Sequence, residues 1–291
     1  MSDDRTVVSS GMLRDWPLPD VDDGAGKRAR GTVVVIGGAA DTPGAVLLAG
    51  IAALRVGAGR LTMATVAANA TALAVAVPEA AVTALPATAD GSLGADAVAA
   101  CSDLVASADA VVIGPGMRNP DNARMLVRGL LAAVGDGTAI VLDAMGLTCG
   151  GYDDTARARI GKHVVATPNR SEARYLVDDD DTDDPEKAAR AVARHLGAVV
   201  TLQSCIAAPD GRLWVDQSGD SGLGTSGSGD VLAGAIAGLA ARGAAPDQAA
   251  VWGAHLHAEA GERLSARIGR LGYLARELLD ELPQVLTQLE R

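Results

Sequence analysis

Residues 32–45 read Thr32-Val33-Val34-Val35-Ile36-Gly37-Gly38-Ala39-Ala40-Asp41-Thr42-Pro43-Gly44-Ala45. The run begins with five consecutive β-branched residues, a pattern typical of a strand that is buried on both faces. A glycine-containing turn follows, and then an apolar, Ala- and Leu-rich stretch from Ala45 to Ala58 that is long enough for a helix. The segment therefore predicts a strand, a loop and a helix in that order, the repeating unit of a parallel sheet.

The same alternation continues along most of the chain and predicts an α/β fold with a largely parallel central sheet and helices on both faces. The expected strands cover residues 32–36, 60–66, 81–85, 110–113, 138–142, 163–166, 199–202 and 212–215. The expected helices cover residues 45–58, 69–77, 95–106, 122–134, 185–196, 230–241, 246–268 and 272–289. The first 30 residues are rich in Pro, Gly and Asp, so we expect residues 1–30 to form an arm and residues 31–291 one domain.

Composition excludes several classes of protein. The chain has 291 residues, a formal net charge of −11 and a sequence pI of about 4.8, which argues against binding nucleic acid. It has neither an uninterrupted apolar run of membrane-spanning length nor a secretory signal pattern, so we expect a cytoplasmic protein without a membrane span. Its three cysteines, Cys101, Cys149 and Cys205, are far apart and fit reduced thiols.

Ligands of open α/β sheets bind where strands end and helices begin, so the turns after the strands are candidate binding loops. The loop 37–45 and the turn Gly114-Pro115-Gly116 lack bulky side chains and would let a ligand approach the backbone, although ordinary turns explain both. Residues 167–172 read Thr-Pro-Asn-Arg-Ser-Glu. Asn169 and Glu172 could cap a short helix, or could face a crevice in which Glu172 orders a hydrated Mg²⁺.

The strongest candidate is the small-residue loop that ends in Gly227-Ser228-Gly229-Asp230 and leads into an apolar helix. Unpaired backbone amides and the helix dipole at such a helix start favour a phosphate. We expect the amides of Gly227, Ser228 and Gly229 to form the anion hole and Asp230 to act as general base on an attacking hydroxyl. The alternative is that Asp230 only caps the helix. His255 and His257 are two residues apart and cannot pair on one helix face, so we expect packing or surface roles for both.

Taken together, six motifs resemble the NAD(P)H-hydrate dehydratase family of the ribokinase-like superfamily. They are Val33–Gly38, Thr42–Ala45, Ala53–Gly59, Gly114–Gly116, Val141–Ala144 and Gly227–Gly234. The resemblance implies a ribokinase-like fold and repair of hydrated NADH or NADPH. A nucleotide, either ADP or ATP with Mg²⁺, would phosphorylate the ring hydroxyl, and loss of phosphate would restore NAD(P)H, with ADP the expected donor.

The resemblance also implies roles for individual residues. Ala45, Gly116, Asn169 and Asp230 would bind the hydrated cofactor, and Gly229 would contact the nucleotide together with Gln203 and Ser204. It assigns no metal ligand, and it implies a homo-oligomer, possibly a tetramer. The family usually has Lys-Gly and a small-residue loop after the strand 199–202, where this chain reads Gln203-Ser204-Cys205-Ile206-Ala207. Loss of that lysine predicts weaker neutralisation of a polyphosphate.

Three hypotheses follow. The first is an ADP- or ATP-dependent NAD(P)H-hydrate dehydratase. The second is a small-molecule kinase of the same superfamily acting on a vitamin-like alcohol, which the Asn169-x-x-Glu172 pattern favours. The third is a non-catalytic nucleotide-binding relative, suggested by the altered segment 203–207.

Overall fold

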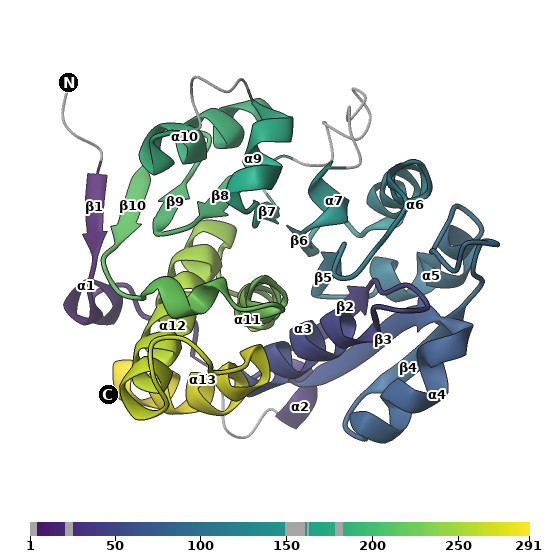
Figure 1. The fold of residues 1–291 in the computed structure, drawn as a ribbon, viewed down its shortest axis with the longest axis horizontal. Helices are drawn as coiled ribbons and strands as arrows, with labels where there is room; N and C mark the ends of the chain where they lie inside the picture. The colour runs from purple at the N-terminus through teal and green to yellow at the C-terminus, as the bar shows by residue number, and fades with distance from the viewer. Residues whose placement is uncertain (1–4, 21–25, 149–160, 162, 178–182) are drawn as a thin grey trace.

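The structure is a computed structural model that describes residues 5–20, 26–148, 161, 163–177 and 183–291 (Figure 1). Its centre is a ten-stranded sheet in the order β1-β10-β9-β8-β7-β6-β5-β2-β3-β4. The strands are β1 (Arg5–Val8), β2 (Thr32–Ile36), β3 (Arg60–Val66), β4 (Ala81–Leu85), β5 (Ala110–Ile113), β6 (Ala139–Leu142), β7 (Val164–Ala166), β8 (Val199–Leu202), β9 (Cys205–Ala207) and β10 (Leu213–Asp216).

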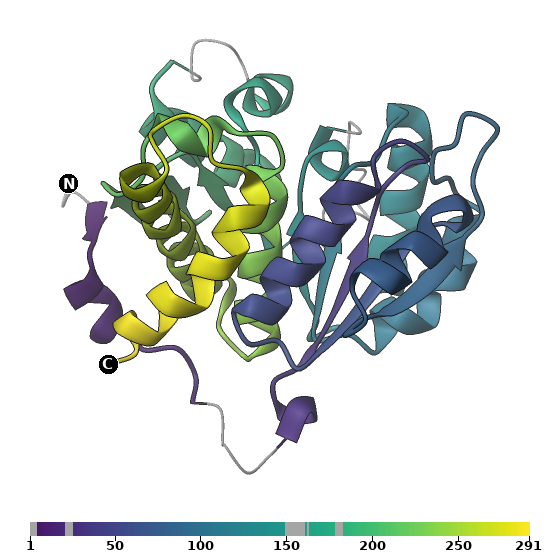
Figure 2. The same ribbon diagram turned by 60° about the horizontal axis from the view of Figure 1, so that its bottom comes forward.

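Helices cover both faces of the sheet, as the strand patterns predict. One face carries α3 (Pro43–Arg55), α4 (Ala67–Ala76), α11 (Ser228–Ala241), α12 (Pro246–Arg267) and α13 (Ala275–Leu289). The other carries α5 (Ala97–Ala106), α6 (Pro120–Ala133), α7 (Met145–Thr148), α9 (Arg170–Leu176) and α10 (Pro185–Leu196). Figure 2 shows α3, α11 and α13 packed together on the first face.

Strand β2 shows why this sequence makes two hydrophobic cores. Val33 and Val35 point into the core under α3 and α11, whereas Val34 and Ile36 point into the core under α5 and α6. All four side chains are buried because successive residues of a strand face opposite sides of the sheet. The prediction of a largely parallel sheet covered on both faces is therefore confirmed.

The sequence pattern missed two strands, β1 and β9, and β9 is the antiparallel one. All pairs in the sheet are parallel except those of β9 with β8 and with β10. Residues 203–207, which we expected to be a loop, form a two-residue turn at Gln203 and Ser204 followed by β9. Gln203 has φ of +53°, which closes the turn tightly. The three residues of β9 are too few to show a strand period of their own.

The N-terminal residues join the edge of the sheet. Strand β1 pairs in parallel with β10, and α1 (Ser10–Arg14) packs near α13 (Figure 2). The Trp16 ring stacks on Trp214 with 6.0 Å between centroids, and Trp252 Nε1 donates a hydrogen bond to the Trp16 carbonyl. The segment 26–29 forms a short helix, α2 (Gly26–Ala29).

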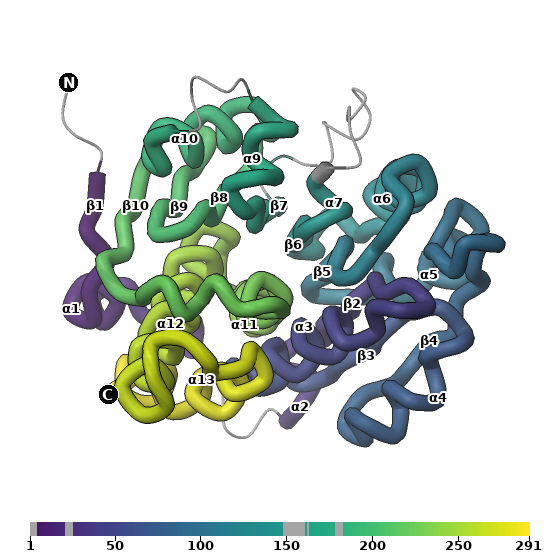
Figure 3. Tube along the Cα trace, viewed as in Figure 1, coloured from purple at the N-terminus to yellow at the C-terminus, as the bar shows by residue number. Residues whose placement is uncertain are grey.

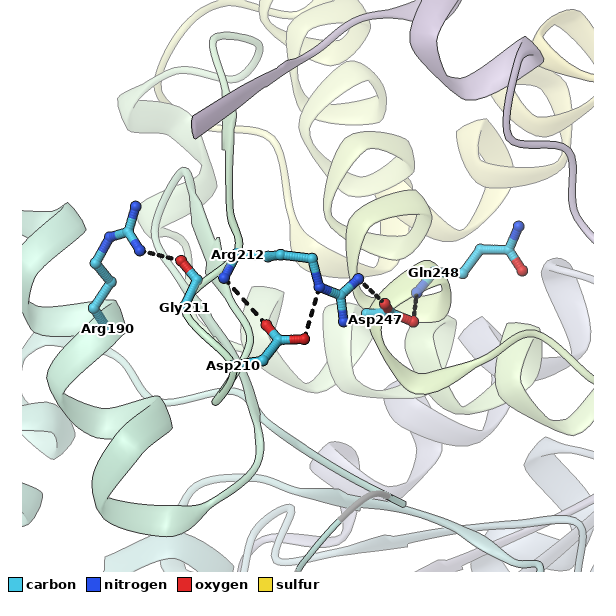
Figure 4. Close-up of polar contacts among 6 residues, drawn as sticks. All are labelled: Arg190, Asp210, Gly211, Arg212, Asp247 and Gln248. Carbon is cyan, nitrogen blue, oxygen red and sulfur yellow. Dashed lines mark hydrogen bonds and ion pairs between the residues drawn. The ribbon is translucent and has the colours of Figure 1, made fainter. Parts of the chain in front are cut away.

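A polar network lies at the amino end of β10, away from the carboxyl ends of the parallel strands. It joins the helix layers on the two faces of the sheet (Figure 4). The guanidinium of Arg212 binds Asp210 in the turn before β10 and, at 2.6 Å, Asp247 at the start of α12. Arg190 of α10 donates to the Gly211 carbonyl in the same turn. These contacts hold β10, and with it Asp216 at its far end, between α10 and α12.

Two further expectations concern the thiols and the membrane. Cys101 and Cys205 are free and buried, whereas Cys149 lies outside the described residues. In the part of the chain that the structure describes, every helix is too short or too polar to traverse a lipid bilayer.

Candidate active site

Strands β7, β8 and β10 end at one edge of the sheet, and a cavity of about 610 Å³ opens there. Figure 3 follows the chain from β10 through the 3₁₀ turn η2 (Ser221–Gly224) into α11, and this segment forms part of the cavity wall. The lining residues are Thr167, Pro168, Asn169, Arg170, Thr201, Gln203, Ser204, Asp216, Ser218, Gly219, Asp220, Leu223, Gly224, Ser228, Gly229, Leu232, Ala254, His257 and Ala258.

This cavity brings together five of the residues that the sequence singled out. Asn169, Gln203, Ser204, Ser228 and Gly229 all line it, although they lie up to 60 positions apart in the chain. The hydroxyl and amide groups of four of them can hydrogen-bond a ligand, and Gly229 adds an exposed backbone. The wall is thus polar where the strands end and apolar at Leu223, Leu232 and Ala254.

Ala45 and Gly116 form a second cluster and are not among the residues that line this cavity. Gly116 has φ of +63°, and a Cβ built on it would lie 2.9 Å from the Ala45 Cβ and 2.6 Å from the Thr42 carbonyl oxygen. Thr42 Oγ1 donates to the Gly116 carbonyl at 2.6 Å and accepts from the Ala39 amide at 3.0 Å. The two glycine-rich loops of the sequence therefore lock together at the start of α3.

Asp230 lies in the first turn of α11, directly after the cavity-lining residue Gly229. A Cβ built on Gly227 would lie 3.8 Å from Asp230 Oδ2 and 2.5 Å from Leu48 Cδ1. Leu48 is one helical turn from Ala45 on α3, so the carboxylate lies on the side of α11 that faces α3. Burial raises the pKa of Asp230 to about 6, and the negative charge of Glu172 adds to this shift.

The backbone amides at the start of α11 differ in whether they already have a hydrogen-bond acceptor. Gly227 precedes α11 with φ of +88°, and the Ser228 amide donates to the Thr225 carbonyl at 3.2 Å. The Ser228 amide thus already has an acceptor in its own turn, and its part in the anion hole stays a prediction. Among described groups, the amides of Gly229 and Asp230 have no acceptor, as expected for the first turn of a helix.

Asn169 and Glu172 form a reciprocal cap on α9. The Glu172 amide donates to Asn169 Oδ1 and the Asn169 amide donates to Glu172 Oε2, both at 2.9 Å. The capping interpretation of this motif is therefore confirmed. Asn169 also lines the cavity, together with the residues expected to bind nucleotide.

Asp143 lies in the motif Val141–Ala144, and the sequence assigned it no role. It follows β6 directly, is 6% exposed, and accepts a 2.7 Å hydrogen bond from Thr167 Oγ1. Its pKa is raised to about 7, mainly by burial and also by the charges of Asp230 and Glu172, while the Thr167 bond acts to lower it. Its position at the carboxyl end of a predicted strand was the signal that could have found it.

For His257 we expected a packing or surface role, and its place in the cavity wall was not foreseen. It is buried in α12, lines the cavity, and its Nε2 lies 2.8 Å from Ser228 Oγ. The small residues Ala254 and Ala258 of the same helix also line the cavity. His255 instead lies 2.9 Å from Asp216 Oδ2 through Nδ1 and packs in the core, as expected.

No group of three or more His, Cys, Asp or Glu side chains among the described residues is arranged to hold a metal ion. Asp143, Glu172 and Asp230 influence one another's charge without forming such a cluster.

The sheet order and the loop that enters α11 define a ribokinase-like fold. A ribokinase-like superfamily protein from Enterococcus faecalis superimposes with a TM-score of 0.82 over 100% of this chain and 99% of its own, at 24% identity, a likeness that concerns the fold alone.

Residues 33–284 match the NAD(P)H-hydrate dehydratase family, and the chain belongs to that family. It is 44% identical over 99% of its length to an ADP-dependent (S)-NAD(P)H-hydrate dehydratase from Xanthomonas campestris, 98% of which it covers. An ADP/ATP-dependent NAD(P)H-hydrate dehydratase from Bacillus subtilis, co-crystallised with ATP/Mg²⁺, has a TM-score of 0.83 and 28% identity, with 98% of this chain and 99% of that chain covered.

The chain also resembles bifunctional NAD(P)H-hydrate repair enzymes. It is 36% identical to the one from Moorella thermoacetica over 98% of its own length, but spans only 54% of that protein. The family resemblance drawn from the motifs is thus confirmed.

Proposed function

We propose that this protein is a nucleotide-dependent NAD(P)H-hydrate dehydratase, with ADP as the expected phosphoryl donor. The observation that carries the proposal is the position of Asp230. Its half-buried carboxylate lies in the first turn of α11, directly after Gly229, which lines a cavity of about 610 Å³, and on the side of α11 where Leu48 of α3 packs. The 44% identity to an ADP-dependent enzyme over nearly the whole chain supports the choice of reaction and of donor.

The proposed reaction has two steps. First, Asp230 takes the proton from the hydroxyl of the hydrated nicotinamide ring, the hydroxyl oxygen bonds to the terminal phosphorus of the nucleotide, and the bond from that phosphorus to the bridging oxygen breaks. Second, the carbon–oxygen bond breaks, phosphate leaves, and a proton leaves the neighbouring carbon as the double bond forms. The amides of Gly229 and Asp230 would stabilise the charge on the transferred phosphoryl group.

We assign the cavity wall at Gln203, Ser204 and Gly229 to the nucleotide, and Ala45 and Gly116 to the hydrated cofactor. Asn169, which lines the cavity, and Asp230 are assigned to the hydrated cofactor as well. Mg²⁺ would accompany the phosphates and lower their negative charge near the three carboxylates. A homo-oligomer and a cytoplasmic location stay predictions from the resemblance and the sequence.

The test is to incubate the protein with hydrated NADH, Mg²⁺ and either ADP or ATP, and to follow both the absorbance of reduced nicotinamide and the release of phosphate. We expect one phosphate for each NADH recovered. A stable phosphorylated product would indicate the small-molecule kinase instead, and nucleotide binding without turnover would indicate a non-catalytic relative.

Asp230→Asn provides the matched control, because the amide keeps the shape of the side chain but cannot accept the proton. We expect kcat to fall by about 10² or more, the range typical of losing a general base, while the nucleotide still binds. Turnover at the wild-type rate by this variant would show that Asp230 is not the base.

A further inference from the structure

The contact between Ser228 and His257 joins the start of α11 to the middle of α12 inside the nucleotide cavity. Ser228 Oγ and His257 Nε2 are 2.8 Å apart, both residues are buried, and both line the cavity. The two residues are 29 positions apart in the chain, so the contact depends on how the two helices pack.

Ser228 can offer an anion its side chain, whereas its amide already donates to the Thr225 carbonyl at 3.2 Å. The next two amides, those of Gly229 and Asp230, have no acceptor among the described groups. The Ser228 hydroxyl is therefore the group at this helix start that could add a third donor beside them.

The imidazole decides which way that hydroxyl points. If Nε2 carries no proton, it accepts from Ser228 and turns the hydroxyl proton away from the cavity. If Nε2 carries the proton, it donates to Ser228 Oγ, and the hydroxyl proton is free to point at a phosphate. Burial lowers the pKa of His257 to about 4, so the ring is neutral near pH 7 and holds a single proton.

We propose that His257 is a positioning residue whose Nε2–H donates to Ser228 Oγ, and that the Ser228 hydroxyl thereby donates to the phosphate chain of the nucleotide. The inference rests on the proposed function only in taking the cavity to bind a nucleotide. It adds a side-chain donor to the anion hole, and it gives His257 a role through Ser228 rather than through direct contact with the reacting atoms.

The first experiment measures ADP binding by calorimetry, in the presence of Mg²⁺, for the full-length protein and four variants. Ser228→Ala and His257→Leu should each weaken binding about 10- to 100-fold, the usual cost of losing a hydrogen bond to a charged group. Ser228→Thr keeps the hydroxyl and His257→Gln supplies an amide N–H, so both should recover most of the affinity. Unchanged affinity in Ser228→Ala or in His257→Leu would overturn the proposal.

A double-mutant cycle separates this role from a structural one. Because His257 acts through the Ser228 hydroxyl, the double variant Ser228→Ala with His257→Leu should bind ADP no more weakly than the weaker single variant. The control pair is Ser228→Ala with His255→Asn, because His255 is a buried histidine on the same helix whose partner is Asp216. In this pair the fold-changes in ADP affinity of the two single variants should multiply. Multiplying effects in the Ser228–His257 pair would overturn the proposal.

The third readout is the tautomer itself. The chain has four histidines, so the ¹⁵N signals of His257 can be assigned by their loss in His257→Gln. We expect the ADP-bound protein to carry the proton on Nε2, and a proton on Nδ1 would contradict the inference.

The binding and tautomer measurements do not require turnover. A failure of this inference can therefore be distinguished from a failure of the proposed function. If the wild-type protein binds ADP with these dependences but does not dehydrate NADH hydrate, only the proposed function fails. If it dehydrates the substrate while the variants bind ADP normally, only this inference fails.

Discussion

Three carboxyl groups, those of Asp143, Glu172 and Asp230, affect one another's charge at the start of α11. Asp230, with its pKa raised to about 6, is the only one with a proposed role in proton transfer. A base must be ionised to accept a proton, so kcat/KM should rise about tenfold per pH unit below pH 6 and level off above it.

The charge of Glu172 contributes to that raised pKa, and this gives a sharper prediction. Glu172→Gln keeps a side chain that can cap α9 but removes the negative charge. The acid limb of the pH profile should therefore move to lower pH. Glu277→Gln makes the same change in the cap of α13, where Glu277 accepts from the Leu274 amide, and should leave the limb in place. An unmoved limb in Glu172→Gln would contradict the coupling.

The raised pKa of Asp143 leads to a prediction about the stability of the protein. The folded pKa of this residue, about 7, lies above the ordinary value of 3.8, so between these pH values the folded protein holds a proton that the unfolded chain has released. The free energy of unfolding therefore falls as pH rises through this window. Asp143→Asn keeps an acceptor for Thr167 Oγ1 and does not ionise. The Tm of this variant minus the Tm of wild type should therefore increase from pH 5 to pH 8. A difference that stays constant over this range would refute the prediction.

At the scale of elements, the packing of α11 on α3 positions the whole site, because α11 carries Asp230 and α3 carries Ala45. The helices approach so closely that a Cβ on Gly234 would lie 2.0 Å from the Ala49 carbonyl oxygen. Backbone cannot move aside as a flexible side chain can, so this position accepts glycine alone without a shift of one helix.

Gly234→Ala should therefore lower stability by about 1–3 kcal/mol, the usual cost of overpacking a core, and should also reduce activity by displacing Asp230. The measurements are urea unfolding and the dehydratase assay. Gly44→Ala in α3 is the control for stability, because a Cβ on that helical glycine meets nothing within 4 Å. Equal stability of the two variants would argue against a critical helix contact at Gly234.

For the whole molecule, the N-terminal arm is part of the hydrophobic core. Val8, Leu13 and Leu18 are at most 9% exposed and belong to the same core as α11 and α12. The stack of Trp16 on Trp214 adds an aromatic contact to the edge of the sheet.

Removing residues 1–19 should cost about 5 kcal/mol or more, because burying each of three aliphatic side chains is worth roughly 1.5–3 kcal/mol. It should also shift the tryptophan fluorescence to longer wavelength as Trp214 becomes exposed. Removing residues 1–4 is the control and should change neither property. Wild-type stability after the longer deletion would show that the arm is dispensable.

The sequence alone determined the order and type of most elements, because strands buried on both faces leave runs of β-branched residues and the helices between them leave longer Ala- and Leu-rich runs. It also pointed to the loop before Asp230, since small residues at a helix start have a local physical meaning. Strand β9 was missed because three residues carry too little pattern.

Only the tertiary structure decided which groups meet. The contact of Ser228 with His257, the coupling of Asp143 to Asp230, and the meeting of Asn169 with Gly229 in one cavity wall all join segments far apart in the chain. Helix packing and strand order set these distances, and neither is encoded in the spacing of residues along one segment. The use of the Ser228 amide within its own turn is local, but it depends on the left-handed backbone at Gly227, which glycine permits without requiring.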